Sequence, residues 1–229
     1  PNWIPNSTSL KSYQRVFDLL PIGRFLINSV IIGFVMMVSN VILCSMAGYT
    51  LARKQFRGRE LIFGLVLCSI MIPLHVRIIP MYLMSINLGL QNTYAGIILP
   101  VAATGFGVFL MRQFFLTMPK EVEDAARIDG CSEWGVLFRI VIPMSRPAVT
   151  SLALFALVWS LEDFLWPLII TSDVSMRPLP VGITLFLGLV VYEWGPVMAS
   201  TVITILPMII VYLFLQRRFI QGLTAGAIK

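Results

Sequence analysis

The chain has 229 residues, of which 58% are hydrophobic and only 12% are charged, and its mean hydropathy is +0.87. A soluble domain carries about 25% charged residues, so this chain has too few polar groups to cover a water-exposed surface. The composition excludes a cytosolic enzyme, a disordered regulator and a secreted disulfide scaffold. The net charge of +6 does not indicate nucleic-acid binding, because the 17 Lys and Arg residues are spread over the short segments between apolar runs.

Five segments are long and apolar enough to cross a membrane, which takes about 20 residues in a helix. Strand-like alternation with a period of two is absent from them, so we expect an all-α, polytopic transmembrane helical bundle. Residues 25–216 form the expected transmembrane domain, preceded by an outer segment, 1–24, and followed by a tail, 217–229. In chain order, the five segments are 25–51, 61–83, 94–115, 147–170 and 195–216.

The distribution of Lys and Arg predicts which ends of the helices face the cytoplasm, because cytoplasmic loops carry an excess of these residues. One set of loops holds five of them, Lys11, Arg15, Arg24, Arg77 and Arg177. The other set holds twelve, Arg53, Lys54, Arg57, Arg59, Arg112, Lys120, Arg127, Arg139, Arg146, Arg217, Arg218 and Lys229. We therefore expect the loops near 84–93 and 171–194 to face outward, and the C-terminus to face the cytoplasm.

The first residues bear on the number of membrane crossings. The chain begins at Pro1, and segment 1–24 lacks the uninterrupted apolar core of a signal peptide. An outward-facing start requires a helix that leads out of the cytoplasm. We therefore expect a sixth, N-terminal crossing before Pro1 in the native protein.

The predicted cytoplasmic loop, 117–146, is too long for a simple connection and carries helix signals of its own. The pattern predicts a helix over 119–129, about 16 Å long. A second helix is predicted over 132–142, with Ser132 as its N-cap, before two prolines interrupt it. The first helix has a proline at its start, acidic side chains in its first turn and a glycine at its end, namely Pro119, Glu121, Glu123 and Gly130.

One face of the first helix is rich in small residues. Val122, Ala125, Ala126 and Asp129 recur at spacings of three and four, which predicts that they share a face. Such a helix either docks a cytoplasmic partner or lies on the lipid headgroups. Because small residues let another surface approach closely and the face lacks Leu and Phe, the pattern favours a protein partner.

A motif in this loop resembles a known family. Asp124-Ala-Ala-Arg-Ile-Asp-Gly130 is followed after nine residues by Ile140-Val-Ile-Pro143. This pattern resembles the EAA loop of ABC importer permeases, which is Glu-Ala-Ala, three residues, Gly, nine residues and Ile-x-Leu-Pro. Asp124 replaces Glu and Ile142 replaces Leu, and both keep the chemical class. Softer matches from about residue 15 onward resemble the carbohydrate-uptake branch, the maltose-type smaller permease, at Asn28-Ser29, 164–168, 216–222 and 226–229.

The resemblance implies a type I ABC importer permease with six crossings. Residues 119–130 would be the coupling helix, seated in a cleft of a separate ATP-binding subunit. The implied partners are two ATP-binding subunits, a second permease, an extracytoplasmic solute-binding protein and the lipid of the inner membrane. The expected ATPase-coupling residues are those of the motif and its acidic neighbours, Glu121, Glu123, Asp124, Ala125, Ala126, Asp129 and Gly130.

This chain itself is expected to be non-catalytic, with no cofactor or metal of its own. It contains no Gly-Lys dipeptide and therefore no phosphate loop, so ATP and Mg are expected on the partner subunits. A membrane-embedded hydrolase is a poor alternative, because one histidine and three scattered cysteines offer no nucleophile–base or metal cluster. An ion-coupled secondary transporter is the alternative from another class, and it would use the carboxylates within the fourth apolar segment.

Those carboxylates are Glu162 and Asp163, at a depth where a charge costs about 2.5–3.5 kcal/mol on insertion scales. Trp159 and Trp166 lie at helical spacing from them, which predicts a shared face. Carboxylates accept hydrogen bonds from hydroxyls, and aromatic rings pack on the apolar faces of sugars, so this face is a candidate translocation path. The alternative is a gate or interhelical contact near the outer surface, with Trp as an interfacial anchor.

Arg77 is the remaining candidate, between Pro73 and Pro80. It either extends its charge to the membrane surface or attracts an anionic solute. The stretches 75–80 and 110–115 resemble permeases of the glycerol-phosphate type. Glycerol 3-phosphate or a glycerophosphodiester is therefore an alternative cargo to a sugar or oligosaccharide.

Overall fold

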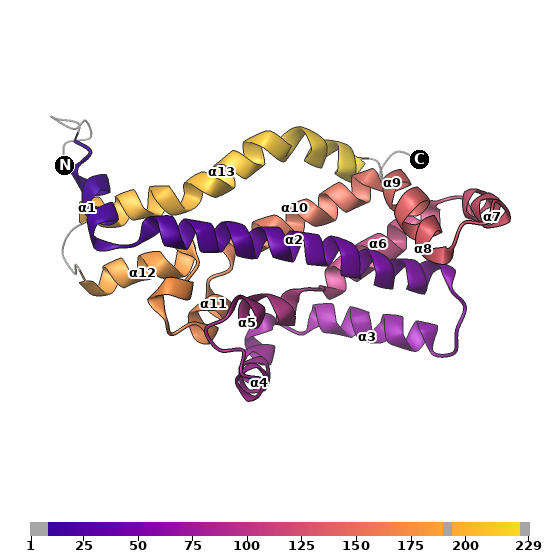
Figure 1. The fold of residues 1–229 in the computed structure, drawn as a ribbon, viewed down its shortest axis with the longest axis horizontal. Coiled ribbons are helices and arrows are strands. Elements are labelled where there is room, and N and C mark those ends of the chain that lie inside the picture. Colours follow the sequence, from indigo (N-terminus) through magenta and orange to yellow (C-terminus); the bar gives the residue numbers. More distant parts are fainter. Residues whose placement is uncertain (1–8, 190–193, 225–229) are drawn as a thin grey trace.

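The computed structural model describes residues 9–189 and 194–224, and every regular element in these residues is helical. Figure 1 shows an elongated bundle in which α2 (Ile22–Arg53) runs along most of the molecule. Of two further long helices, α10 (Arg146–Glu162) packs on α2, and α13 (Trp194–Thr224) packs on α10. The short helix α1 (Lys11–Leu19) packs on α13. The expectation of an all-α protein is confirmed for the described residues.

The central helix, α2, owes its length to the absence of charge and proline between residues 25 and 51. Its 32 residues span about 48 Å, more than the roughly 30 Å of a bilayer core. Small residues bring α2 close to α6 (Gly105–Thr117): a Cβ added at Gly48 would lie 2.9 Å from the backbone nitrogen of Arg112. Such small-residue contacts are typical of helix packing in membranes.

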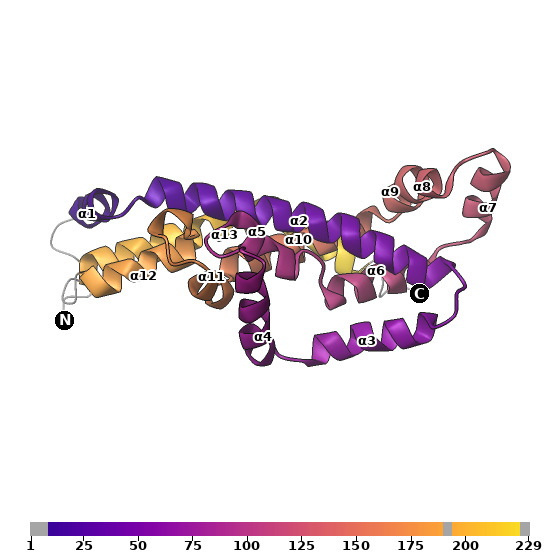
Figure 2. The same cartoon turned by 60° about the horizontal axis from the view of Figure 1, so that its bottom comes forward.

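The segment 61–83, expected as one helix, is two. The structure contains α3 (Arg59–Met71) and α4 (Leu74–Asn87), which meet at an angle of 105°. The expectation of a continuous helix was wrong because Pro73 disfavours helical geometry at the residue before it, and Ile72 is indeed extended. Figure 2 shows α3 running roughly parallel to α2 and α4 standing across that direction, and α3 packs on α6.

The segment 94–115 is also broken, into α5 (Tyr94–Ile98), the 3₁₀ turn η1 (Leu99–Val101) and α6, with a bend of 45°. Asn40 of α2 satisfies the backbone at the break. Its amide donates to the Val101 carbonyl at 3.1 Å, and its oxygen accepts from the Thr104 backbone N–H at 3.1 Å. A buried polar residue in α2 thus stabilises a break in a neighbouring helix.

The segment 147–170 divides into α10 and α11 (Leu165–Ile170). The break lies at Asp163, whose backbone is extended. Pro167 accounts for it, because a proline ring clashes with the carbonyl four residues earlier and supplies no N–H to bond it. The expectation that Trp159 and Trp166 share one helical face was therefore wrong.

The remaining elements extend or interrupt the expected loops. The loop near 171–194, which was expected to face outward, contains η3 (Val174–Met176) and a further helix, α12 (Leu179–Leu189), which packs on α2 and α13. Helix α13 continues to Thr224, eight residues past the expected end at 216. Residues 226–229, part of the family resemblance, lie outside the described residues.

Within the described residues, two single helices are long and apolar enough to cross a membrane, Ile22–Arg53 and Trp194–Val211 of α13. The number rises to five if each of three bent helix pairs counts as one crossing. Four of these crossings overlap the expected segments, whereas the fifth joins Glu133–Met144 to Arg146–Glu162 and so differs from the expected segment 147–170. Many large apolar side chains are exposed on these helices, as a lipid-facing surface requires. Examples are Val30, Phe34, Leu61, Leu65 and Val202.

Several short helices lie at the two ends of the elongated bundle (Figure 2). One end holds α1, α12 and the start of α2. The other holds the end of α2 and the four short helices of the loop 117–146, which extend past the bundle. These are α7 (Glu121–Ile128), α8 (Glu133–Gly135), the π-helical turn η2 (Val136–Val141) and α9 (Ile142–Met144).

Candidate functional site

The candidate site is centred on α7, which spans Glu121–Ile128 and is shorter than the expected 119–129. Its start carries three acidic residues, which favour the positive end of a helix. Its end is a Schellman motif, in which Gly130 is left-handed at φ 83° and the Cys131 N–H donates to the Ala126 carbonyl at 2.9 Å. The glycine expected to end this helix does so, because a residue with a Cβ is strained at this φ.

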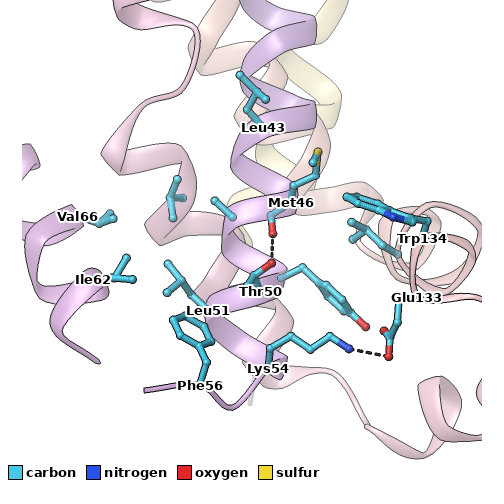
Figure 3. Close-up of a pocket in the computed structure, with 14 residues that line it drawn as sticks. Leu43, Met46, Thr50, Leu51, Lys54, Phe56, Ile62, Val66, Glu133 and Trp134 are labelled. Atoms are coloured by element: carbon cyan, nitrogen blue, oxygen red, sulfur yellow. Dashed lines mark hydrogen bonds and ion pairs between the residues drawn. The ribbon is translucent and has the colours of Figure 1, made fainter. Parts of the chain in front are cut away.

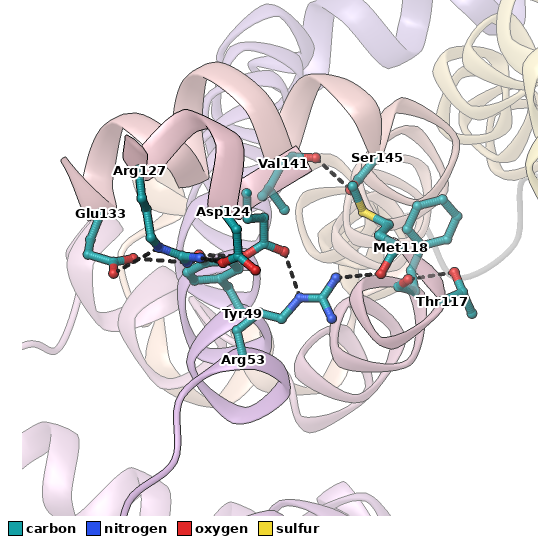
Figure 4. A network of polar contacts seen from close by, with 11 residues as sticks. Tyr49, Arg53, Thr117, Met118, Asp124, Arg127, Glu133, Val141 and Ser145 are labelled. Carbon is teal, nitrogen blue, oxygen red and sulfur yellow. Dashed lines mark hydrogen bonds and ion pairs between the residues drawn. The ribbon is translucent and has the colours of Figure 1, made fainter. Parts of the chain in front are cut away.

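The inner face of α7 is anchored by a buried carboxylate, that of Glu123, which is only 2% exposed. Its Oε1 accepts from Arg53 Nε at 2.7 Å, and its Oε2 accepts from the Tyr49 hydroxyl at 3.0 Å. Both partners belong to the last turns of α2, as Figure 4 shows. Ala126, also on this face, is buried in an apolar cluster that includes Tyr49 and Phe115.

Arg127 joins the buried and exposed parts of this network (Figure 4). Its guanidinium donates to Asp124 at 2.8 Å, to Glu133 at 3.3 Å and to Glu123 at 3.3 Å. Desolvation lowers the pKa of Arg127, but the hydrogen bond and charge of Glu133, with Tyr49 and Asp124, raise it more, so the net pKa is above its usual value. Arg127 is therefore a permanent cation between three carboxylates.

Glu133 forms a second connection between this loop and α2. Lys54 Nζ lies 2.6 Å from Glu133 Oε1, and this hydrogen bond lowers the pKa of the Glu133 carboxyl below 4.5, against the opposing effect of desolvation. Hydrogen bonding to Arg127 and the charges of both cations lower it further. Unlike Glu123, this carboxylate is half-exposed.

The outer face of α7 contacts nothing in the described chain that would cover it. Ile128 is 87% exposed, and Glu121, Ala125 and Asp129 are also exposed. The face expected from the spacing is divided: Val122, Ala125 and Asp129 point outward, whereas Ala126 points inward. The motif residue Asp124 is exposed beside this outer face and paired with Arg127.

The second helix of the loop positions α7 beyond the end of the bundle. Ser132 Oγ accepts from the Gly135 backbone N–H at 3.2 Å, which confirms the expected N-cap. The expected helix 132–142 is instead α8, η2 and α9 in succession, and its direction changes by 85° at Ser145, where α10 follows. Val136, Leu137 and Val141 bury its inner side in the same cluster as Ala126.

An apolar cavity of about 580 Å³ adjoins this network. Figure 3 shows its walls, which come from α2, α3, α6 and α8 and include Leu43, Met46, Ile62, Val66 and Trp134. The Lys54–Glu133 ion pair lies at its edge. This cavity could not be predicted from the sequence, because its walls come from segments far apart in the chain.

Three further members of the site, Tyr49, Arg53 and Arg127, were not expected from the sequence. A signal was present: Tyr49 and Arg53 are four residues apart on α2, as are Glu123 and Arg127 on α7. Each pair therefore lies on one helical face. Nothing in the sequence indicated that the two faces meet.

Three of the residues expected to line a translocation path, Trp159, Glu162 and Asp163, lie at the far end of α10. Trp159 is 42% exposed and packs on Phe106 and Phe155, with ring centroids 5.3 and 5.7 Å away. Glu162 is exposed and Asp163 half-buried. Phe155, Trp159 and Glu162 follow one another at spacings of four and three, so they share a face of α10.

Trp166 lies apart from that face. It is completely buried, and its Nε1 donates to the carbonyls of Gly96 and Ile97 at 3.2 and 3.1 Å. Arg77 is exposed on α4. In the described residues, 9–189 and 194–224, no three His, Cys, Asp or Glu side chains are grouped to hold a metal ion.

Together, the broken apolar helices and the short helix projecting beyond them define a polytopic membrane protein with an exposed helical loop at one end. A family model described as "Binding-protein-dependent transport system inner membrane component" matches residues 41–225. The chain belongs to this family of inner-membrane transport subunits.

Relatives and a solved structure agree with this assignment. The chain is 41% identical over 202 residues to "Arabinooligosaccharides transport system permease protein AraQ" of Halalkalibacterium halodurans, which covers 88% of this chain and 72% of the relative. It is 35% identical over 205 residues to "sn-glycerol-3-phosphate transport system permease protein UgpE" of Yersinia pestis bv. Antiqua, and this alignment covers 89% of this chain and 73% of the relative. A bacterial ABC transporter that imports the acidic polysaccharide alginate has the same fold, with a TM-score of 0.83, 23% identity and coverage of 94% of this chain and 81% of that chain.

These findings confirm the expected ABC importer permease and its helical membrane fold. The protein is a transport subunit of the inner membrane. The EAA-like motif that carried the expectation, Asp124–Gly130, forms α7 and the turn that ends it.

Proposed function

We propose that this chain is one permease of an ATP-driven importer for a sugar or oligosaccharide. It forms the translocation path with a second permease, and two ATP-binding subunits hold ATP and Mg and hydrolyse the nucleotide. An extracytoplasmic solute-binding protein delivers the cargo to the side of α1 and α12, and the C-terminus lies in the cytoplasm. Support for this cargo comes from the similarity to an arabinooligosaccharide permease.

The observation that carries the proposal is the two-sided structure of α7. Its inner face is fixed to α2 by the buried Glu123, while its outer face leaves Ile128 87% exposed. Exposed apolar surface in an otherwise ion-paired region is typical of a protein interface. A helix held on one side and open on the other is suited to insertion into a cleft of an ATP-binding subunit.

The motif residues divide their roles according to these faces. Glu121, Ala125 and Asp129 form the docking surface together with the exposed side of Asp124. Ala126 provides a small buried contact that keeps α7 close to the bundle, and Gly130 ends the helix. The Asp124 carboxylate, now 2.8 Å from Arg127, is free to exchange this partner for a cation of the ATP-binding subunit.

The translocation path is proposed to pass the face of α10 that carries Trp159 and Glu162. The clustered rings of Phe106, Phe155 and Trp159 provide apolar surface for a sugar ring. Glu162 accepts hydrogen bonds from hydroxyl groups, and Asp163 stabilises the break between α10 and α11 through the backbone N–H groups of Leu165 and Trp166. An exposed carboxylate on a membrane helix favours a water-filled surface over lipid.

Glycerol 3-phosphate or a glycerophosphodiester is the second candidate cargo. Arg77 is exposed on α4, and the similarity to a glycerol-3-phosphate permease points to the same chemistry. An exposed cation of this kind would attract a phosphate ester. An Arg77→Gln variant separates the two candidates, because it is expected to reduce uptake of the phosphate ester and to leave sugar uptake unchanged.

Reconstitution of the whole importer tests the proposal. The proteoliposomes contain both permeases, the ATP-binding subunits and the solute-binding protein. They are expected to take up labelled arabinooligosaccharide only when ATP is present on the side of the membrane that the ATP-binding subunits face. Uptake by this permease without ATP-binding subunits, driven by an ion gradient, would contradict it. That result would identify an ion-coupled transporter instead.

A further inference from the structure

Arg53, in the last turn of α2, contacts two other elements at once. Its Nε lies 2.7 Å from Glu123 Oε1 on α7, and its Nη2 donates to the Met118 carbonyl, just past the end of α6, at 2.7 Å. The Arg53 and Glu123 side chains are only 4% and 3% exposed. The ends of α2 and α6 and the inner face of α7 therefore meet at one buried guanidinium.

Both oxygens of the Glu123 carboxylate accept hydrogen bonds in this arrangement. Besides Arg53, it accepts from the Tyr49 hydroxyl at 3.0 Å and from Arg127 Nη2 at 3.3 Å. Tyr49 is fixed in turn by an edge-to-face contact with Phe115, at 6.0 Å between centroids. A buried carboxylate with several donors tolerates little displacement, because loss of a donor leaves a charge without compensation.

The Lys54–Glu133 pair provides an internal comparison. It also joins the end of α2 to the loop that carries α7, but its side chains are 39% and 51% exposed. Exposed pairs are screened by water and contribute little. The two pairs are neighbours with the same charges, and burial is the main difference between them.

We infer that the Arg53–Glu123 ion pair is the mechanical link through which movement of α7 reaches α2. This inference rests on the proposed function of α7 as the docking helix. Glu123 and Arg53 are positioning residues in this role: they do not touch ATP or cargo, but they make α7 and α2 move together. Without the pair, α7 follows the ATP-binding subunit while α2 does not.

Helix α2 is suited to carry such a movement across the membrane. It packs on α6, α10 and α12 along its length. At its far end, the Asn28 amide donates to the carbonyls of Ser175 and Arg177 at 2.8 and 2.9 Å. A displacement at Arg53 would thus reach the segment between α11 and α12 through one continuous helix.

The test uses the reconstituted importer and the ratio of solute transported to ATP hydrolysed. In Glu123→Gln, we expect the ATP-binding subunits to remain bound and ATP hydrolysis to continue, while the ratio falls about tenfold. Glu133→Gln is the matched control, since it removes the same charge from the exposed pair, and it should keep the wild-type ratio. A wild-type ratio in Glu123→Gln, or an equal loss in Glu133→Gln, would overturn the inference.

A charge-conserving substitution separates loss of the ion pair from simple misfolding. Arg53→Lys keeps the positive charge opposite Glu123 and should retain part of the wild-type ratio, whereas Arg53→Met removes the charge at similar length and should lower the ratio about tenfold. If Arg53→Met keeps the wild-type ratio, or Arg53→Lys loses as much of it as Arg53→Met, the inference is contradicted. Failure of the proposed function has a different signature: α7 would not cross-link to the ATP-binding subunit even in the wild-type importer.

Discussion

Trp166 and Ile97 are joined by a hydrogen bond from the indole Nε1 to the backbone carbonyl, at 3.1 Å. The same N–H lies 3.2 Å from the carbonyl of Gly96. Both carbonyls belong to α5, a helix too short to satisfy its own C-terminal acceptors. Trp166 therefore supplies a hydrogen-bond donor to backbone carbonyls at the break between α5 and α6, and its role is structural.

We predict that Trp166→Phe destabilises the protein by about 1–3 kcal/mol, because it leaves buried carbonyls without a donor. Thermal unfolding in detergent measures this effect. Trp159→Phe is the control: that ring is 42% exposed, and no hydrogen bond from its N–H is present in the described residues. Equal destabilisation by both substitutions would contradict the assignment of Trp166.

Gly48 determines how closely α2 approaches α6. A Cβ added there would lie 2.9 Å from both Arg112 N and Met111 Cβ, whereas a Cβ at Gly23 of the same helix meets nothing within 4 Å. We predict that Gly48→Ala forces the helices apart and lowers stability by about 1–3 kcal/mol. Gly23→Ala is expected to be neutral or stabilising, because alanine favours helix. Thermal unfolding of both variants tests this prediction, and equal stability of the two would contradict the close contact at Gly48.

Much of the fold could be predicted from the sequence because apolar length and charge placement dominate in a membrane protein. The uncharged stretch 25–51 identified α2, and the acidic start and glycine stop identified α7. The breaks at Pro73 and Pro167 were also encoded, but apolar runs continue through them, so composition alone gave unbroken helices. Hydropathy alone does not show where a helix bends when the residues on both sides of the bend are apolar.

The site was predictable only in part, for a related reason. The spacing found the motif Asp124–Gly130, but three-residue and four-residue periodicity does not say which face of a short helix is inward. Glu123 was grouped with docking residues, yet it is buried because Arg53 of a distant segment neutralises its charge. The burial of Glu123 depends on a contact between segments about seventy residues apart, and no pattern within either segment predicts that contact.

Asn40 is predicted to hold the break between η1 and α6. Its side chain donates to the Val101 carbonyl and accepts from both the backbone N–H and the hydroxyl of Thr104, at 3.0–3.1 Å. Asn40→Leu keeps the volume and removes these bonds, with an expected cost of about 1–2 kcal/mol in a membrane setting. Ser39→Ala removes only a bond within α2, to the Met36 carbonyl, and should change stability little. Thermal unfolding compares the two, and a larger loss in Ser39→Ala would be inconsistent with this role.

The ion pairs of Glu133 predict a pH dependence of stability. Because its folded-state pKa is lowered from 4.5 by Lys54 and then Arg127, the carboxylate stabilises the fold above pH 4.5, and this contribution is lost as the pH falls through the lowered pKa. The difference in unfolding free energy between the wild type and Glu133→Gln should therefore shrink from about pH 5 downward. Since the pair is half-exposed, the difference should be small and should also shrink with salt. A difference that grows at low pH would oppose the prediction.

The central claim, that an ATP-binding subunit grips the outer face of α7, is tested most directly by site-specific cross-linking in the assembled importer. A photo-reactive residue at position 128, which is 87% exposed, should cross-link to the ATP-binding subunit, and one at position 126, which is 7% exposed, should not. If position 128 instead labels lipid or remains in contact with water while the importer is active, the claim is wrong.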